Sequence, residues 1–194
     1  MKHNFENTPR QLIAIARAMM GADPAHGWPH IVRVHKLSRK IAEGLDEPVN
    51  WRILEAAILL HDIGRSIEGV EHHAVKSARF AGEILPGLGY GVDEVESIVH
   101  AIRSHSFSLG EAATTLEAKI LSDADKLDAL GAVGIARVIH TGCRINRSFE
   151  DSLRHFHEKI LGLPEHMYLE PSRRMAYRRL EIVRRFVSQL EEEL

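Results

Sequence analysis

Ala56-Ala57-Ile58-Leu59-Leu60-His61-Asp62-Ile63-Gly64-Arg65 is a nearly all-apolar run that ends in an adjacent imidazole and carboxylate. A helix that is apolar on most faces is a buried one, and a buried carboxylate is costly unless it is paired or holds a metal. A cation would satisfy both His61 and Asp62. Gly64 suits the left-handed position that ends a helix, so the pair would lie at a helix mouth open to a ligand. The alternative is that His61 caps helix carbonyls and Asp62 pairs with Arg65.

The composition is that of an ordinary globular protein. With 194 residues, 44% of them hydrophobic and 27% charged, the chain can bury a full core, and we expect a single domain over residues 1–194. The formal net charge of -2 argues against a nucleic-acid or membrane partner. A single cysteine, Cys143, fits a reducing compartment, and no segment resembles a signal peptide or a membrane span. The sequence therefore predicts a cytoplasmic protein.

Apolar residues recur with helical spacing along the whole chain, and no segment alternates with period two for long enough to be a convincing strand. We therefore expect an all-α bundle of about eight to nine helices. Thr8 is expected to cap the first helix, since Pro9 and Gln11 follow it at the positions typical of a helix start. The other helices are expected to begin near Pro29, Asn50, His73, Asp93, Thr114, Gly131, Ser148 and Ser172.

The chain has 13 histidines, and helix phase separates six of them into inward and outward positions. His35 falls off the apolar stripe of its helix and is expected to be a solvated surface residue. Buried histidines usually hydrogen-bond within a core, so an inward position does not by itself indicate a ligand. The inward histidines are His30, His73 and His105, and the outward ones are His72 and His100.

Three aspartates fall within six residues of one apolar helix, at positions 123, 125 and 128. Because aspartate is a weak helix former, we expect at least one of them to be kept for a ligand. Donors on separate helices, namely His30, the His61-Asp62 pair and Asp125, can converge on one cation, as in other helical bundles. Their mixed imidazole and carboxylate chemistry argues against structural zinc and favours Mn, Fe, Co, Ni or catalytic Zn. Asp123 and Asp128 fit helix capping or hydrogen bonds to ligand histidines better than ligation.

Three motifs occur along the chain in the order His30-x-x-Arg33-Val34, His61-Asp62-Ile63-Gly64 and Ala124-Asp125-Lys126-Leu127. Together they resemble the signature of the HD-domain superfamily, whose small bacterial and archaeal members are all-helical metal-dependent phosphohydrolases. The resemblance covers roughly residues 26–138, and helices within residues 148–194 are expected to pack on that core. It implies that the first metal is held by His30, His61, Asp62 and Asp125.

The resemblance also implies a second metal. Relatives with a histidine after the HD motif and another at the end of the next helix hold two ions, and His73 and His105 match that pattern. The expected cofactor is one or two divalent ions of Mn, Fe, Co, Ni, Zn or Mg, with Asp62 as the bridge. The sequence does not choose between one ion and two.

The implied activity is hydrolysis of a phosphate ester or phosphoanhydride, most simply of a nucleotide, by a metal-activated hydroxide. Phosphoryl transfer requires mainly positioning and charge neutralisation, which Arg65, Lys126 and Arg33 could supply. A surface salt bridge is an equal alternative for Lys126. Two other functions stay open: a di-iron oxygenase with the same ligands, and a ligand-sensing domain without catalysis. The paired arginines of the last helix fit a solvated basic face, with a polyanionic substrate or a homodimer face as alternatives.

Overall fold

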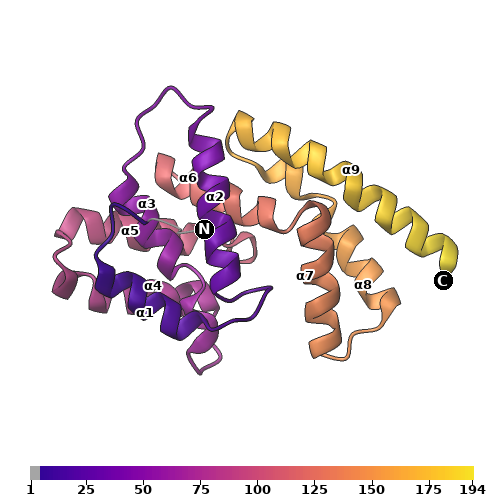
Figure 1. Cartoon of the computed structure of the whole chain (residues 1–194), viewed down its shortest axis with the longest axis horizontal. Helices are drawn as coiled ribbons and strands as arrows, with labels where there is room; N and C mark the ends of the chain where they lie inside the picture. The colour runs from indigo at the N-terminus through magenta and orange to yellow at the C-terminus, as the bar shows by residue number, and fades with distance from the viewer. Residues whose placement is uncertain (1–4) are drawn as a thin grey trace. The chain divides into compact units, whose positions relative to one another are not determined.

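The computed structural model describes residues 5–194, and every regular element in that range is helical (Figure 1). This confirms the all-α prediction. Short turns of tighter or wider helix join the α-helices: η1 (Ile63–Ser66), η2 (Pro86–Leu88), η3 (Phe107–Leu109), η4 (Phe156–Ile160) and η5 (Leu163–His166). The α-helices are α1 (Arg10–Met20), α2 (Trp28–Ala42), α3 (Trp51–Leu60), α4 (His73–Ile84), α5 (Val92–Ser104), α6 (Leu116–Asp128), α7 (Gly131–Arg144), α8 (Phe149–His155) and α9 (Glu170–Glu193).

The chain folds into two compact units, Met1–Ser122 and Asp123–Leu194, and the boundary falls within α6. That residues 1–194 form one domain therefore stays a prediction. No helix in the described range is long and apolar enough to cross a bilayer.

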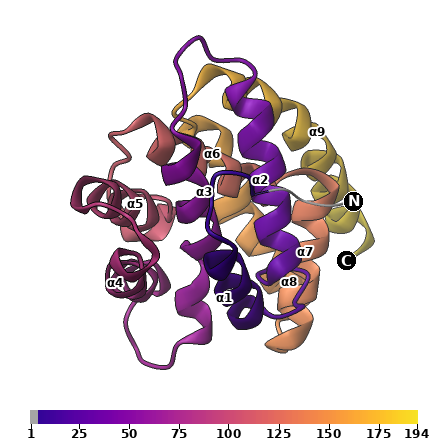
Figure 2. The same ribbon diagram turned by 60° about the vertical axis from the view of Figure 1, so that its left-hand side comes forward.

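The first unit is built around α3. The Asn50 side chain accepts a hydrogen bond from the Ile53 backbone and starts the helix, as the sequence predicted. Residues 54–60 are fully buried, and α3 packs against α5 and α2, while α4 lies alongside α5 (Figure 2). Full burial of each leucine or isoleucine in this run contributes about 1.5–3 kcal/mol, which makes α3 the centre of the core. Glu55 is the one charged residue in the run.

In the second unit, two of the three aspartates of α6 tie helices together. Asp123 accepts hydrogen bonds of 2.9 Å from the backbone amides of Tyr168 and Leu169, at the start of α9. Asp128 pairs with Arg137 of α7 at 2.8 Å. Both side chains are buried, and these contacts link helices rather than reach a ligand histidine. That neither aspartate binds a metal stays a prediction.

The arginines of α9 form mainly surface contacts. Arg173 and Arg174 pair with Glu170 at 3.0 and 3.7 Å, on exposed side chains. Such exposed pairs contribute about 1 kcal/mol or less. Arg179 differs, because its guanidinium donates to the Leu127 carbonyl at 2.5 Å and ties α9 to the end of α6. The contacts agree with a solvated basic face, and the roles in substrate binding or a homodimer stay predictions.

Candidate metal centre

His61 and Asp62 lie where α3 ends and η1 begins, and both side chains are almost completely buried. The expectation that Gly64 adopts a left-handed conformation is wrong, because Gly64 lies within η1 and its φ is not positive. Glycine is required there for another reason. A Cβ atom would lie 2.1 Å from the His73 carbonyl oxygen and 2.8 Å from the Ser77 amide nitrogen. The missing side chain lets α4 approach η1, which brings His73 to Asp62.

Replacing Gly64 with alanine is expected to destabilise the protein by about 3 kcal/mol or more, at the upper end of the cost of overpacking. The clash is with backbone atoms, which cannot rotate away. Urea unfolding followed by circular dichroism measures the change. Gly87→Ala is the matched control, since a Cβ at Gly87 meets nothing within 4 Å. Equal stability of the two variants would contradict this account.

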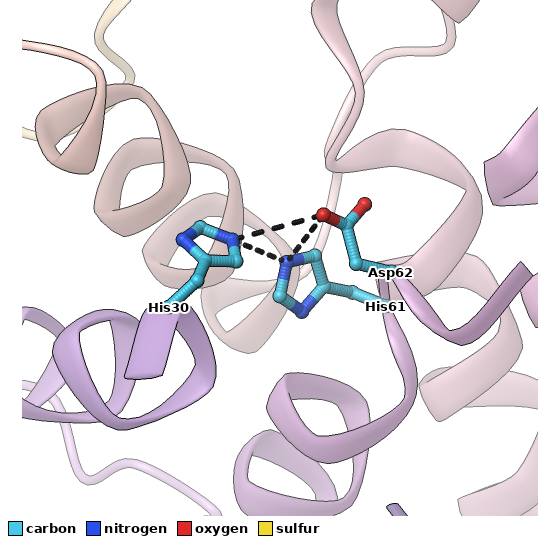
Figure 3. A group of neighbouring side chains, drawn as sticks. All are labelled: His30, His61 and Asp62. Atoms are coloured by element: carbon cyan, nitrogen blue, oxygen red, sulfur yellow. Dashed lines mark hydrogen bonds and ion pairs between the residues drawn. The ribbon is translucent and has the colours of Figure 1, made fainter. Parts of the chain in front are cut away.

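His30, His61 and Asp62 form the first group of candidate ligands, and their side chains point toward one another from α2 and the end of α3 (Figure 3). The two Nε2 atoms are 3.2 Å apart. Asp62 Oδ2 lies 3.8 Å from His30 Nε2 and 4.0 Å from His61 Nε2. Imidazole nitrogens at about 2.0–2.1 Å from a shared cation lie about 3 Å apart, so the spacing fits an ion.

Asp62, His73 and His105 form the second group, on the other oxygen of the same carboxylate. Asp62 Oδ1 lies 3.3 Å from His73 Nε2 and 3.8 Å from His105 Nε2. Within residues 5–194, this buried oxygen has no hydrogen-bond partner. A buried oxygen without a partner is costly, and a cation between it and the two imidazoles would remove that cost. The residues present therefore fit a metal ion in each group.

Backbone carbonyls fix two of the imidazoles in the ligand tautomer. His61 Nδ1 lies 2.8 Å from the Ile58 carbonyl, and His105 Nδ1 lies 2.5 Å from the Ile102 carbonyl. Because a carbonyl only accepts, each Nδ1 must carry the proton, and in a neutral ring the Nε2 lone pair is then available to a metal. Such a hydrogen bond on the far nitrogen is typical of metal-binding histidines.

The contacts of the non-metal alternative are also present. His61 donates to a carbonyl of its own helix, and Arg65 Nε lies 2.8 Å from Asp62 Oδ2. They involve only part of each side chain: His61 Nε2 faces His30 Nε2 at 3.2 Å, and Asp62 Oδ1 faces His73 and His105. The structure therefore contains the non-metal contacts and, beside them, side chains grouped as a metal ion would require.

The electrostatics favour the protonation states that bind metal. Burial opposes ionisation of Asp62, but the neighbouring His61 and His26, followed by Arg65, hold the pKa of this carboxyl well below its usual range. Burial lowers the pKa of His73 to about 3, against the attraction of Asp62. At neutral pH the site therefore presents a carboxylate and a neutral imidazole, which are the ligand forms.

The other predicted site residues are Arg65, Arg33, Asp125 and Lys126. Arg65 lies at the centre: its Nη2 is 3.3 Å from His73 Nε2, and its side chain is partly exposed. Arg33 Nη2 donates to the Pro24 carbonyl at 2.9 Å. Asp125 and Lys126 belong to the second unit, where Asp125 is half-buried and the Lys126 ammonium lies 5.1 Å from the Tyr168 ring centroid. Burial lowers the pKa of Lys126. The roles of Arg33, Asp125 and Lys126 stay predictions.

Sequence analysis assigned no role to one histidine at the site, His26. His26 Nδ1 lies 3.5 Å from Asp62 Oδ2, with a third of its side chain exposed. Hydrogen bonds within the loop hold His26 in place, because Asp23 Oδ1 accepts from the backbone amides of Ala25 and His26 at 2.7 and 3.0 Å. Its place in the turn just before the helix that carries His30 was the available signal.

Helices that deliver four imidazoles to the two oxygens of one buried aspartate define an all-helical protein with a histidine–aspartate cluster positioned to bind metal. The chain belongs to the HD-domain family, whose model matches residues 27–130. Members of this family bind divalent metals, in agreement with the two groups of ligands.

Relatives of known sequence and structure support the same family. The Bacillus subtilis protein YpgQ is 32% identical over 178 residues, which are 87% of this chain and 84% of YpgQ. The crystal structure of YpgQ in complex with ADP superimposes with a TM-score of 0.74 at 26% identity, covering 95% of this chain and 97% of that one. A predicted HD superfamily hydrolase from an uncultured Thermotogales bacterium reaches 0.69 at 34% identity, covering 97% and 95% of the two chains. An HD-superfamily hydrolase from Bacillus thuringiensis reaches 0.71 at 31% identity, covering 95% of each.

Proposed function

We propose that this protein is a metal-dependent phosphohydrolase that cleaves a phosphate ester or phosphoanhydride of a nucleotide. The observation that carries the proposal is the environment of Asp62, whose two oxygens face different pairs of histidines. Neighbours described as HD superfamily hydrolases support hydrolysis. The complex of YpgQ with ADP supports a nucleotide as the ligand, since YpgQ covers most of this chain.

The two groups of ligands would hold two divalent ions. The first ion would be held by His30, His61 and Asp62, with Asp125 as the fourth ligand that the HD motifs imply. The second ion would be held by Asp62, His73 and His105. When bound, a divalent ion lowers the pKa of water toward neutrality and offsets the negative charge of phosphoryl oxygens. Mn, Fe, Co, Ni, Zn and Mg are the candidate ions.

The chain's own residues position the substrate and neutralise its charge. Arg65 is anchored by Asp62 through Nε, while its partly exposed guanidinium can face a phosphate. Burial of His61 and His105 keeps their rings fixed and dry, so that electrostatic interactions there are stronger than in water. Arg33 and Lys126 are proposed to add positive charge for the nucleotide phosphates, as phosphoryl transfer requires.

A nucleoside triphosphate is expected to be hydrolysed at least about tenfold faster than a sugar monophosphate, because a longer polyphosphate can contact more of the cationic groups. The assay measures phosphate and pyrophosphate release by the purified protein, with Mn, Mg, Co and Ni supplied in turn. Asp62→Asn protein, prepared in parallel, reports the background from contaminating phosphatases.

Equal rates on the two substrates, or activity confined to monophosphates, would contradict the nucleotide assignment. Oxygen uptake with mixed-valent iron and no phosphate release would replace hydrolysis by the di-iron oxygenase alternative. Nucleotide binding without any turnover, with all four metals, would support the sensing alternative instead.

A further inference from the structure

A second buried polar cluster lies in the first unit, outside the metal centre. Its hub is Glu55 of α3, which is fully buried. The Asn7 backbone amide and the Thr8 hydroxyl donate to Glu55 Oε2 at 2.9 and 3.2 Å. His35 Nε2 and Arg39 Nη2 of α2 lie 3.4 Å from Oε1. We refer to these five residues as the Glu55 cluster.

Two members of the cluster differ from their sequence-based expectations. His35, expected on the solvated side of α2, is buried, because the N-terminal segment covers it and places the Phe5 ring 4.4 Å from its own. Thr8, expected to cap α1, instead donates to Glu55, and α1 has no side-chain cap. In both cases a tertiary partner replaced the local role.

The cluster holds a charge within the core. Burial disfavours ionisation of Glu55, but hydrogen bonds from His35 and Asn7 outweigh it and lower the pKa of the carboxyl. Replacing all the partners of a buried ionic cluster by apolar side chains of similar volume is often neutral or stabilising. Stability alone therefore gives no reason for a carboxylate at this position.

The cluster joins the same two helices that meet at the metal centre. Helix α2 carries His30 at the centre and His35 and Arg39 at the cluster, while Glu55 lies six residues before His61 at the end of α3. At 1.5 Å per residue, the cluster is about 7–14 Å from the ligand pair along the helices. Polar contacts at two positions along the helices, the Glu55 cluster and the His30–His61 pair, fix both the axial position and the crossing angle of α2 relative to α3.

The metal ligands His30 and His61 require this relative position of α2 and α3, which we call their register. Apolar packing is non-directional, and a slide of one residue along a helix is about 1.5 Å. A metal centre tolerates displacements of only about 0.5 Å. Hydrogen bonds to a buried carboxylate have strict geometry and are expensive to lose, so they resist such a slide.

We propose that Glu55 is a positioning residue for the metal centre: through His35 and Arg39 it holds α2 and α3 in the register that brings His30 and His61 together. The inference rests on the proposed metal site. It assigns Glu55 no contact with metal or substrate.

Co(II) added to the metal-free full-length chain tests the proposal, with the dissociation constant and the visible absorption spectrum as readouts. Glu55→Met is expected to weaken Co(II) binding at least about tenfold, the lower end of the effect of removing a group that orients ligands. The helical spectrum of the metal-free chain should match that of the wild type at the assay temperature, while its melting temperature should fall, because the donors around Glu55 lose their acceptor. Glu55→Gln, which keeps one acceptor oxygen, should show a smaller loss and carries the test if Glu55→Met does not fold.

Glu94→Gln is the matched control, because Glu94 also pairs with an arginine of α3, Arg52, at 2.8 Å but on a partly exposed surface. Its Co(II) affinity should equal that of the wild type. Wild-type affinity and spectrum in the folded Glu55 variants would overturn the positioning role while leaving the metal site intact. A loss of equal size in Glu94→Gln would overturn it as well. A wild-type chain that binds no Co(II) would overturn the metal site itself, and this inference with it.

Discussion

Replacing Asp62 with asparagine is expected to abolish metal binding in both groups of ligands and to lower phosphate release by at least about 10³-fold. An amide keeps the shape of the side chain but offers neither negative charge nor two equivalent oxygens. Both oxygens of Asp62 face imidazoles. A bound ion supplies several kcal/mol of charge stabilisation, and 1.36 kcal/mol corresponds to tenfold in rate. Elemental analysis of the metal content and the phosphate assay measure the two effects.

Asp93→Asn is the control for this variant, because Asp93 is an exposed aspartate in the first turn of α5. It should keep the metal content and the rate of the wild type. His30→Ala, His61→Ala and Asp125→Ala should each lose metal and turnover while keeping a helical spectrum. Undiminished turnover in Asp62→Asn or in any of these three would contradict the ligand assignment.

His73→Ala and His105→Ala are each expected to lower the metal content from about two ions per chain to about one. Both imidazoles face Asp62 Oδ1, whereas His30 and His61 face Oδ2. Loss of the second group should therefore leave the first intact. Elemental analysis of desalted protein after saturation with Mn or Co measures the stoichiometry. Circular dichroism shows whether the variant that lacks the buried His105 side chain still folds.

His72→Ala and His100→Ala are sequence-neighbour controls that should keep both ions. His72 Nδ1 accepts from the Ala74 backbone at 3.2 Å and caps α4. His100 Nε2 accepts from the backbone amide and hydroxyl of Thr114 at 3.1 and 2.9 Å. A wild-type chain that binds one ion under saturating metal would return the site to a four-ligand form. The loss of an ion in His100→Ala would place the second group elsewhere.

The sequence by itself determined the helical fold, most helix limits and the inward histidines. These features are local: a 3.6-residue period shows which face of a helix is apolar, and His30, His73 and His105 fall on such faces. The expected outward positions of His72 and His100 agree with their contacts outside the metal centre: His72 caps α4, and His100 bonds Thr114. The position of Asp62 at the end of a buried helix was also readable from the order of residues.

Only the tertiary structure decided what lies opposite each face. Periodicity gives the orientation of a side chain about its own helix, not the identity of its neighbour. It could not show that His35 meets a buried carboxylate or that His26 reaches Asp62 from a loop. Gly64 is a similar case, because a glycine in the sequence fits either a left-handed turn or a close approach of two backbones. Only the structure shows that the backbone of α4 occupies the place where a Cβ of residue 64 would lie. The division of Asp62 between two pairs of histidines depends on four segments meeting at one point, and long-range packing alone brings them there.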